Sequence, residues 1–557
     1  MGSILAKKKL FELFIPSMLM CMTGNVTAIL DTVFISNFVN LEAVSAIQLI
    51  MPLVSVIAVL EWIFGLGGQI VSLNKKSEFD EQGSNYYYTL SIVSVLVFST
   101  LFSIFCFLDL DSLLTFLQGT STTIPYMRQY IPFLLIDIPV TCFVSILAQF
   151  IRVDGKARFA TFILVIASVV NVILDFVFLH YFKMGVMGAS IASFIGYLVS
   201  AIIIFKYFFD SDRTFRFVNI FHSFKSLCVR FVEVVKVGLP GACTELSFVL
   251  IGFFMNFVIE RVLFDQGLAM YTICDDAFLI ISIILIGFVE SLSSLIPVYY
   301  SQEDYSNVKF LFKESFILMF ICSLVFTLVL WLVPGVFIGL YHVQSNVAGF
   351  EFTLRVFSLS FILQSVSTIL IFYYESIERT FISALIAFVN ILIGPILFVL
   401  LLLPVIGSSA IWLSVSFACL LAYLVAYVYI KFVGRRETEY NGALFIKNEV
   451  LENSKNYEIN AENKNQLTEE IFTYIESLGV YEKSYKTFKD LLDGIFKYND
   501  DKVLVEVLLI KYEDKIKINI KDNGKDNIIN ELGDKIKDNF KYNKVLGLNS
   551  LESTINI

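Results

Sequence analysis

Charged residues and histidines are scarce in this chain of 557 residues. Asp, Glu, Lys and Arg make up 16% of the sequence, whereas soluble domains carry roughly a quarter charged residues. A water-soluble fold of this size would therefore lack the polar residues to cover its surface. The 3 histidines are His180, His222 and His342. None precedes the C-terminal region on a helix suited to accept a phosphoryl group, which disfavours a histidine kinase.

The sequence also lacks cysteine pairs and an excess of positive charge. Its 8 cysteines show no CxxC spacing, so we interpret them as small buried apolar residues rather than as a metal or redox site. The net charge of −9 excludes a strongly basic surface of the kind that binds nucleic acid. We therefore expect no nucleic-acid partner and no resident metal or cofactor.

Hydrophobic residues, in contrast, make up 57% of the chain. They form runs of about 20 residues between Leu10 and Lys431, the length that crosses a hydrocarbon layer of about 30 Å. The composition changes near Arg435, after which polar residues dominate and no run reaches spanning length. The sequence predicts an all-α polytopic membrane protein with about twelve transmembrane helices in two six-helix lobes, plus a small soluble α/β domain. The predicted segments are an N-lobe over 1–220, a C-lobe over 221–436, a polar linker over 437–465 and a C-terminal domain over 466–557.

Basic residues indicate the orientation, because Lys and Arg accumulate on the cytosolic side of a membrane. They cluster in alternate connections, from Lys7–Lys9 to 431–436, whereas the opposite connections carry single residues such as Arg128 and Arg261. Both termini are therefore predicted to be cytosolic, in a multi-pass protein of the plasma membrane. The apolar stretch after Lys9 continues to about Phe38 without a cleavage site, so it is predicted to be the first spanning helix rather than a signal peptide.

A faint internal repeat relates the two halves. Asn171 resembles Asn390, and Gly188 with the two residues that follow resembles Gly407 with its two. Because six helices per half give both halves the same topology, we expect an axis of pseudosymmetry along the membrane normal and a central cavity between the lobes.

Four segments stand in a characteristic order along the chain: Ile29–Ser36, Arg152–Gly155, Asn171–Asp175 and Gly185–Ser193. Together they resemble the multidrug and toxic compound extrusion (MATE) family, bacterial members more than eukaryotic ones. The resemblance covers roughly residues 8–433. It implies two six-helix lobes that export organic, often cationic, compounds by alternating access in exchange for Na⁺ or H⁺. The segment Glu290–Pro297 departs from the Gly- and Gln-rich family pattern, which leaves the substrate range open.

Two carboxylates at membrane depth, Asp31 and Asp175, are the first candidates for a coupling site. A charge at a helix centre costs roughly 2.5–3.5 kcal/mol on insertion scales, so such residues usually have a function. Asn171 lies four residues before Asp175 and hence on the same helical face, and Ser193 would come from the next helix. The resemblance maps the family's N-lobe cation site onto these four residues. The alternative is that they are hydrogen-bonding contacts between packed helices.

Further acidic residues lie in the predicted spans. Glu245 is the candidate for the substrate cavity, because members of the family place an acidic residue there. Asp275 and Asp276 are adjacent, so we expect at most one of them to face the same cavity surface. For Glu61 and Asp137 a helix-pairing role and a cavity role are equally open.

The C-terminal region is predicted to contain helices at 467–478 and 484–498 and strands at 503–511 and 515–521. This order resembles the ATP-binding domain of histidine kinases and anti-sigma-factor kinases. Gly494 replaces the Mg²⁺-ligating Asn of that family, so we expect a degenerate domain, and a domain without nucleotide is an equal alternative. The resemblance places the nucleotide-binding residues at Asp490, Gly494, Asp522, Gly524 and Gly547.

The sequence as a whole predicts a secondary active multidrug exporter that uses Na⁺ or H⁺ as the coupling ion, and not an enzyme. Its partners would be small-molecule substrates and the lipid bilayer, with a regulatory protein partner of the C-terminal domain left open. Two alternatives are a membrane sensor or regulatory protein and a flippase for lipid-linked precursors. The flippase would favour a basic cavity, whereas the charges at membrane depth here are mostly acidic.

Overall fold

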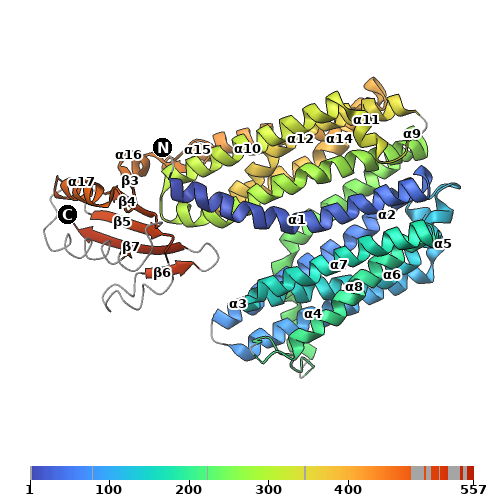
Figure 1. Cartoon of the computed structure of the whole chain (residues 1–557), viewed down its shortest axis with the longest axis horizontal. Helices are drawn as coiled ribbons and strands as arrows, with labels where there is room; N and C mark the ends of the chain where they lie inside the picture. The colour runs from blue at the N-terminus through green and yellow to red at the C-terminus, as the bar shows by residue number, and fades with distance from the viewer. Residues whose placement is uncertain are drawn as a thin grey trace.

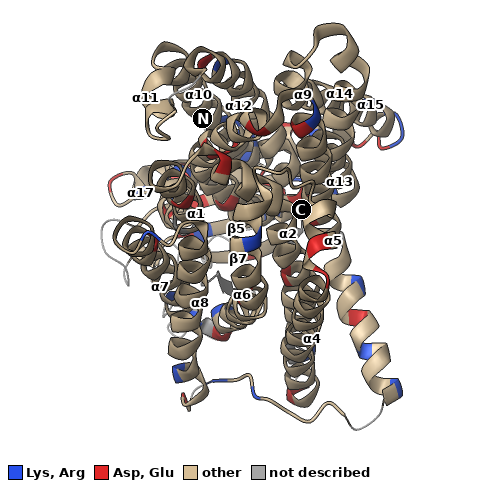
Figure 2. Ribbon diagram, turned by 90° about the vertical axis from the view of Figure 1, so that its right-hand side faces the viewer, with Lys and Arg blue, Asp and Glu red and all other residues tan. Residues whose placement is uncertain are grey.

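The computed structural model describes residues 3–77, 80–211, 213–221, 224–343, 346–477, 495–496, 503–512, 515–524, 540–543 and 548–556. These residues form a large helical domain, which the apolar runs predict, and a smaller C-terminal domain built around a β-sheet (Figure 1). Few charged residues lie along the helices, so most of the helical ribbon is tan in Figure 2. We call the end of the helical domain that contacts the C-terminal domain the docked end, and the opposite end the far end.

The N-lobe contains eight α-helices and three π-helical segments among the described residues. Each π-helical segment continues a longer helix, and such segments occur frequently at functional sites. The elements are α1 (Ile4–Phe38), α2 (Leu41–Leu60), η1 (Glu61–Leu66), α3 (Gly67–Ser77), α4 (Glu81–Leu108), α5 (Leu110–Phe116), α6 (Ile124–Ile151), η2 (Arg152–Lys156), α7 (Ala157–Phe176), η3 (Val177–Tyr181) and α8 (Val186–Phe208).

The C-lobe begins with a single long helical element. Among the described residues, 11 helices are long and apolar enough to cross a membrane, by length and composition. One of them, Gly241–Ser301, has 61 residues, too many for one straight helix in a layer of about 30 Å. Phe264 interrupts it with φ of 56° and ψ of −160°, so it comprises two spans, in agreement with the twelve predicted helices. The C-lobe elements are α9 (Phe224–Ser301), α10 (Tyr305–Leu332), α11 (Pro334–Gly339), α12 (Val347–Ser376), α13 (Thr380–Phe388), η4 (Val389–Ile393), α14 (Gly394–Ile406) and α15 (Ser409–Gly434).

The internal repeat is visible in the backbone, with one correction to the register. Gly185 precedes α8 with φ of 63° and ψ of −155°, and Gly407 precedes α15 with φ of 63° and ψ of −148°. Only glycine adopts this region readily. Conformation therefore pairs Gly407 with Gly185, whereas the sequence pattern paired it with Gly188, which lies inside α8.

The first helix of each half crosses to the other half toward the docked end. In α1, the ring of Phe14 stacks on Phe288 of α9 with centroids 4.2 Å apart. At the start of α9, Glu233 accepts a hydrogen bond from the Tyr87 hydroxyl of α4. The helices α1 and α9 thus each contact both lobes.

Hydrogen bonds join the two lobes directly at the far end. Ser45 of α2 donates to the carbonyl of Asp265 over 2.7 Å, and Thr120 donates to the Asp265 carboxylate over 3.2 Å. Thr272 of α9 donates to Gln48 of α2 over 3.1 Å. The two bundles accordingly converge at the far end and diverge toward the docked end (Figure 1).

The C-terminal domain contains a five-stranded antiparallel sheet in the order β3-β4-β5-β7-β6. The structure contains the predicted helix at 467–478 and both predicted strands, while most of the predicted helix at 484–498 lies outside the described residues. The prediction of a polar linker at 437–465 is corrected, because this segment contains a hairpin and an edge strand. The few apolar residues in the segment did not indicate these strands. The elements are β1 (Tyr440–Asn441), β2 (Ile446–Lys447), α16 (Asn448–Glu452), β3 (Ser454–Ile459), α17 (Lys464–Ser477), β4 (Val505–Lys511), β5 (Lys515–Asp522), β6 (Phe540–Asn543) and β7 (Leu548–Asn556).

Successive side chains along a strand point to opposite faces of a sheet, and both faces of this sheet are covered. One face of β4 and β5 packs on α17 through residues such as Val507 and Ile518. The opposite face presents Leu508 and Ile510 to the helical domain. The sheet is therefore a layer between α17 and the docked end of the C-lobe.

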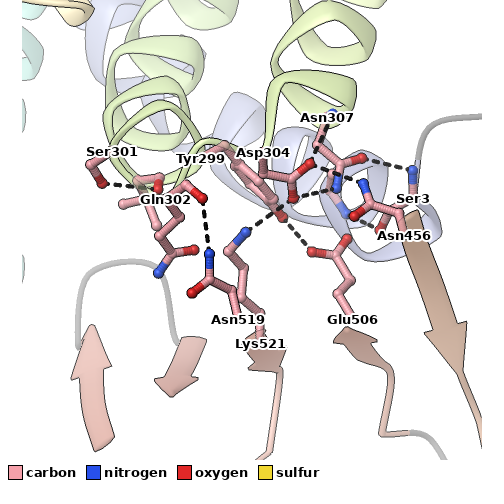
Figure 3. Close-up of polar contacts among 12 residues, drawn as sticks. Ser3, Tyr299, Ser301, Gln302, Asp304, Asn307, Asn456, Glu506, Asn519 and Lys521 are labelled. Atoms are coloured by element: carbon pink, nitrogen blue, oxygen red, sulfur yellow. Dashed lines mark hydrogen bonds and ion pairs between the residues drawn. The ribbon is translucent and has the colours of Figure 1, made fainter. Parts of the chain in front are cut away.

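A buried polar cluster holds the sheet against the connection between α9 and α10 (Figure 3). Lys521 of β5 forms an ion pair of 3.2 Å with Asp304, and its ammonium lies 3.9 Å from the centre of the Tyr299 ring. The side chains of Lys521 and Asp304 are only 2% and 1% exposed. Glu506 of β4 accepts a hydrogen bond of 3.2 Å from the Tyr299 hydroxyl, and Asn456 of β3 donates to Asp304 over 2.9 Å. Charges buried this deeply require partners. Here the partner of the buried Lys521 of the sheet is Asp304 of the helical domain, so the contact between the two domains is specific.

The charge balance of this cluster predicts a pH-dependent stability. Burial raises the pKa of Glu506 from 4.5 to about 8; the nearby Lys521 and the Tyr299 hydroxyl lower it, whereas Asp304 and Glu458 raise it. The native protein therefore keeps a proton that an exposed glutamate releases. Its free energy of unfolding should fall as the pH rises from about 4.5 to about 8, and should not change further through this group above about 8.

We expect Glu506→Gln to remove this pH dependence. Between about pH 6 and about pH 8 the free energy of unfolding of the wild type should fall by up to about 1.4 kcal/mol per pH unit relative to that of the variant. The measurement is the midpoint of thermal unfolding of the two proteins at each pH. Glu452→Gln, at an exposed position of the same domain, is the matched control. Equal pH slopes for the wild type and Glu506→Gln would contradict the protonated state of Glu506.

Candidate functional site

The four residues predicted as a coupling site come from α1, α7 and α8. Asn171 donates a hydrogen bond of 3.0 Å to the Ser193 hydroxyl, and the carboxyls of Asp31 and Asp175 are within hydrogen-bonding reach of each other. The tight approach of α7 and α8 depends on Gly196, where an added Cβ would lie 2.6 Å from the carbonyl oxygen of Ala167. The structure thus brings all four predicted residues together.

Two ionised carboxylates both accept and cannot donate, so their proximity supplies no hydrogen bond. Several oxygens of this cluster are therefore buried without a hydrogen-bond donor among the described residues. They are both carboxyl oxygens of Asp175, one of Asp31 and the amide oxygen of Asn171, and Asp175 is 0% exposed. An orphaned buried acceptor is costly, and a carboxylate is costlier still. A proton or a cation bound by these oxygens would relieve that cost.

The donor set limits which ion fits. Carboxylate, amide and hydroxyl oxygens are hard ligands, which suit Na⁺ and similar cations. Within the described part of the chain, no three His, Cys, Asp or Glu side chains are grouped closely enough to hold a metal ion. With two carboxyls and neutral oxygens, the cluster suits a monovalent cation or a proton better than a transition metal.

A cavity of about 490 Å³ lies between α1 and α2 on one side and the C-lobe helices on the other. Three carboxyls line it, from Glu245, Asp275 and Asp276. Glu245, predicted as a residue of the substrate cavity, lies in this lining, and its role in substrate binding stays a prediction. The expectation for Asp275 and Asp276 was wrong, because both line the same cavity. Side chains at positions 271, 272, 275, 276, 278 and 279 of α9 all line it, so it borders a face of that helix wide enough for side chains about 100° apart. Its aromatic lining consists of Phe248, Tyr271, Phe278 and Phe357.

Polar residues that the sequence did not single out also line the cavity. Asn390, the repeat counterpart of Asn171, donates to Gln364 over 3.0 Å, and both side chains face the cavity. Tyr341 donates a hydrogen bond of 2.9 Å to Asp276. The repeat could have indicated Asn390. Nothing in the local sequence connects Tyr341, which lies in the turn after α11, with Asp276 of α9.

Adjacent residues of α1 connect the two sites. Asp31 contacts Asp175 of α7, while Thr32 lines the cavity and lies within hydrogen-bonding reach of Asp276 of α9. A movement of this part of α1 would change both contacts together. The geometry is therefore suited to communication between the Asp31–Asp175 pair and the cavity.

The remaining predicted residues are only partly placed. Glu61 lines a second pocket together with Arg152, and Asp137 is 4% exposed inside the N-lobe. In the C-terminal domain, Asp522 accepts hydrogen bonds from the Gly524 amide over 2.8 Å and from Asn549 over 2.7 Å. The other predicted nucleotide-binding residues, Asp490, Gly494 and Gly547, lie outside the described residues. Nucleotide binding by this domain stays a prediction.

The comparison with known families decides the class of protein. The profile of the MatE family matches residues 16–177 and 240–400, once in each half. The chain belongs to the MatE family. The double match follows the two halves of the structure and agrees with the internal repeat.

Relatives and solved structures agree with this assignment. The chain is 22% identical to the multidrug export protein MepA of Staphylococcus saprophyticus over 64% of this chain and 79% of that protein. It is 24% identical to MepA of Staphylococcus haemolyticus over 42% of this chain and 51% of that protein, so this match spans about half the length of that relative.

The fold matches an inward-facing multidrug resistance MATE transporter of the MOP superfamily with a TM-score of 0.69 and 17% identity, over 77% of this chain and 99% of the other. An outward-facing structure of such a transporter matches with a TM-score of 0.61 and 19% identity, over 77% of this chain and 95% of the other. At these identities the match establishes the shared fold.

Proposed function

We propose that this MatE-family transporter exports organic cations in exchange for Na⁺ or H⁺, with the Asp31–Asp175 cluster as the coupling site. The single observation that carries this proposal is a set of buried carboxyl and amide oxygens on α1 and α7 that have no hydrogen-bond partner within the part of the chain that the structure describes. A coupling ion that binds there would alter α1, which also borders the cavity at Thr32. Exchange requires that ion and substrate binding influence each other, and α1 supplies a direct physical link.

The acidic, aromatic lining of the cavity supports a cationic substrate. Carboxylates attract a cation strongly when water is scarce, and aromatic faces add cation–π attraction. The curated relatives are described as multidrug export proteins. The same lining disfavours the anionic substrates of a flippase for lipid-linked precursors. Lys and Arg accumulate on the cytosolic side of a membrane, and here they cluster in alternate connections. We therefore place the docked end, with both termini, in the cytosol.

The test is export of a fluorescent cationic dye from proteoliposomes that contain the full-length chain. Imposed Na⁺ and H⁺ gradients are applied separately, with a neutral dye as the control substrate. Export driven by either gradient supports the proposal and identifies the ion. Absence of gradient-driven export of any cationic dye would contradict it.

We expect Glu245→Gln to weaken binding of the cationic dye by about ten-fold, equivalent to about 1.4 kcal/mol. The variant keeps the size of the side chain and removes one of the three cavity carboxyls. The dissociation constant is measured by fluorescence anisotropy on the purified protein. Glu42→Gln, at an exposed position in the first turn of α2, should leave the affinity unchanged. Equal affinities for the wild type and Glu245→Gln would exclude Glu245 from the binding site.

A further inference from the structure

The C-terminal domain, which lies beyond the residues that the MatE profile matches, contacts the first turn of α1. Glu458 of β3 accepts hydrogen bonds from the backbone amides of Ile4 and Leu5, over 3.0 Å and 2.9 Å. The amides at a helix start have no partner within the helix, and a negative charge there is favoured by the helix dipole. The carboxylate of Glu458 is thus a cap supplied by a different domain, from a residue more than 450 positions away in the chain.

The same turn of α1 is tied to the C-lobe. The Ser3 amide donates to Asn307 of α10 over 3.1 Å. Asn307 in turn donates to Asp304 over 3.0 Å, the residue that forms the buried ion pair with Lys521 (Figure 3). The start of α1, the start of α10 and the sheet therefore form one continuous hydrogen-bonded assembly.

The hairpin β1–β2 attaches the C-terminal domain to the C-lobe at a second place. The hydroxyls of Tyr300, Tyr373 and Tyr374 donate to the carbonyls of Phe445, Leu444 and Ala443, over 2.7, 2.9 and 2.9 Å. Because these contacts involve neither α1 nor the N-lobe, the domain should stay docked on the C-lobe when the contact with α1 is broken. Glu458 can therefore be tested separately from the docking of the domain.

Farther along α1, the contacts change from one lobe to the other. Asn25 donates to the carbonyl of Leu279 in α9 over 3.1 Å, whereas Asp31 contacts Asp175 of the N-lobe. When the lobes rotate relative to each other, α1 cannot keep both sets of contacts unchanged. Anything that strengthens the contact of its first turn with the C-lobe favours the arrangement seen here, with the lobes joined at the far end.

We propose that the C-terminal domain is a regulatory clamp on α1: through Glu458 it holds the first turn of α1 on the C-lobe and favours the state with a diverged docked end. Release of this contact allows α1 to follow the N-lobe and lets the docked end close. The importance of the clamp for transport rests on the proposed function, but its effect on conformation does not.

The test measures conformation without substrate or gradient. Spin labels are placed at Gln82 of α4 and Lys313 of α10, both exposed at the docked end. The background is the full-length chain with the exposed Cys228 and Cys243 replaced by serine. We expect Glu458→Ala to raise the ratio of closed to diverged docked ends by about ten-fold or more, because it removes two hydrogen bonds to a charged group. Glu458→Gln, which can still accept hydrogen bonds, should give an intermediate ratio.

The matched control is Glu469→Ala, at an exposed position on α17 of the same domain. It should reproduce the wild-type distance distribution. If Glu458→Ala also gives the wild-type distribution, the clamp is overturned, whatever the transport assays show. Conversely, a failure to find gradient-driven export would leave a shift in these distances intact, so the two proposals fail separately.

Discussion

Asp175→Asn is expected to reduce gradient-driven dye export by about 10- to 100-fold, the range of typical coupling free energies. Asparagine keeps the size and hydrogen-bonding shape of the side chain but cannot ionise. The variant therefore retains the packing around a residue that is 0% exposed while it removes a charge that the coupling ion would neutralise. Initial rates in proteoliposomes under the gradient that drives the wild type give the measurement. Asp31→Asn should have an effect of similar size, because the two carboxyls contact each other.

The control for this prediction is Asp111→Asn, a carboxyl that is 75% exposed and pairs with Arg128. Export by this variant should equal that of the wild type. Dye binding in the absence of a gradient separates loss of coupling from loss of the binding site, since the variants at Asp31 and Asp175 should still bind the dye. Undiminished export in both variants would show that the cluster is a packing contact between helices, the alternative that the sequence left open.

Gly238→Val is expected to destabilise the transporter by about 1–3 kcal/mol, the usual cost of overpacking. Gly238 lies where the start of α9 crosses η1 and α3. A Cβ at this position would lie 2.5 Å from the carbonyl oxygen of Ile63 and 2.6 Å from that of Trp62. A backbone carbonyl cannot move aside as a flexible side chain can. The two helices must therefore separate, which weakens the attachment of α9 to the N-lobe.

The loss should appear as a lower midpoint of thermal unfolding in detergent. The control is Gly24→Ala in α1, where an added Cβ has no atom within 4 Å. A Gly to Ala change inside a helix stabilises it by about 1 kcal/mol when space allows, so the control should shift the midpoint upward or not at all. A Gly238→Val protein as stable as the wild type would mean that α9 does not approach η1 this closely.

The cluster proposed as the coupling site was largely predictable because its signals are local. Asn171 and Asp175 share a helical face by spacing alone, and apolar helices make any carboxylate conspicuous. The resemblance to the MATE family then supplied Asp31 and Ser193. The cavity was less predictable. We expected at most one of Asp275 and Asp276 to face the cavity, because their spacing in the sequence gives the angle between the two side chains. The sequence does not indicate how wide a face of the helix the cavity borders.

By itself, the sequence determined the membrane class, the approximate number of spanning helices, the boundary near Arg435 and the strands at 503–511 and 515–521. Each of these depends on hydrophobicity and periodicity over a few consecutive residues. Only the tertiary structure decided that β3 joins the sheet, that Lys521 pairs with Asp304, and that Glu458 caps α1. Polar contacts between residues hundreds of positions apart leave no local pattern, because each partner alone resembles an ordinary surface residue. Burial and pairing become visible only when packing brings the two together.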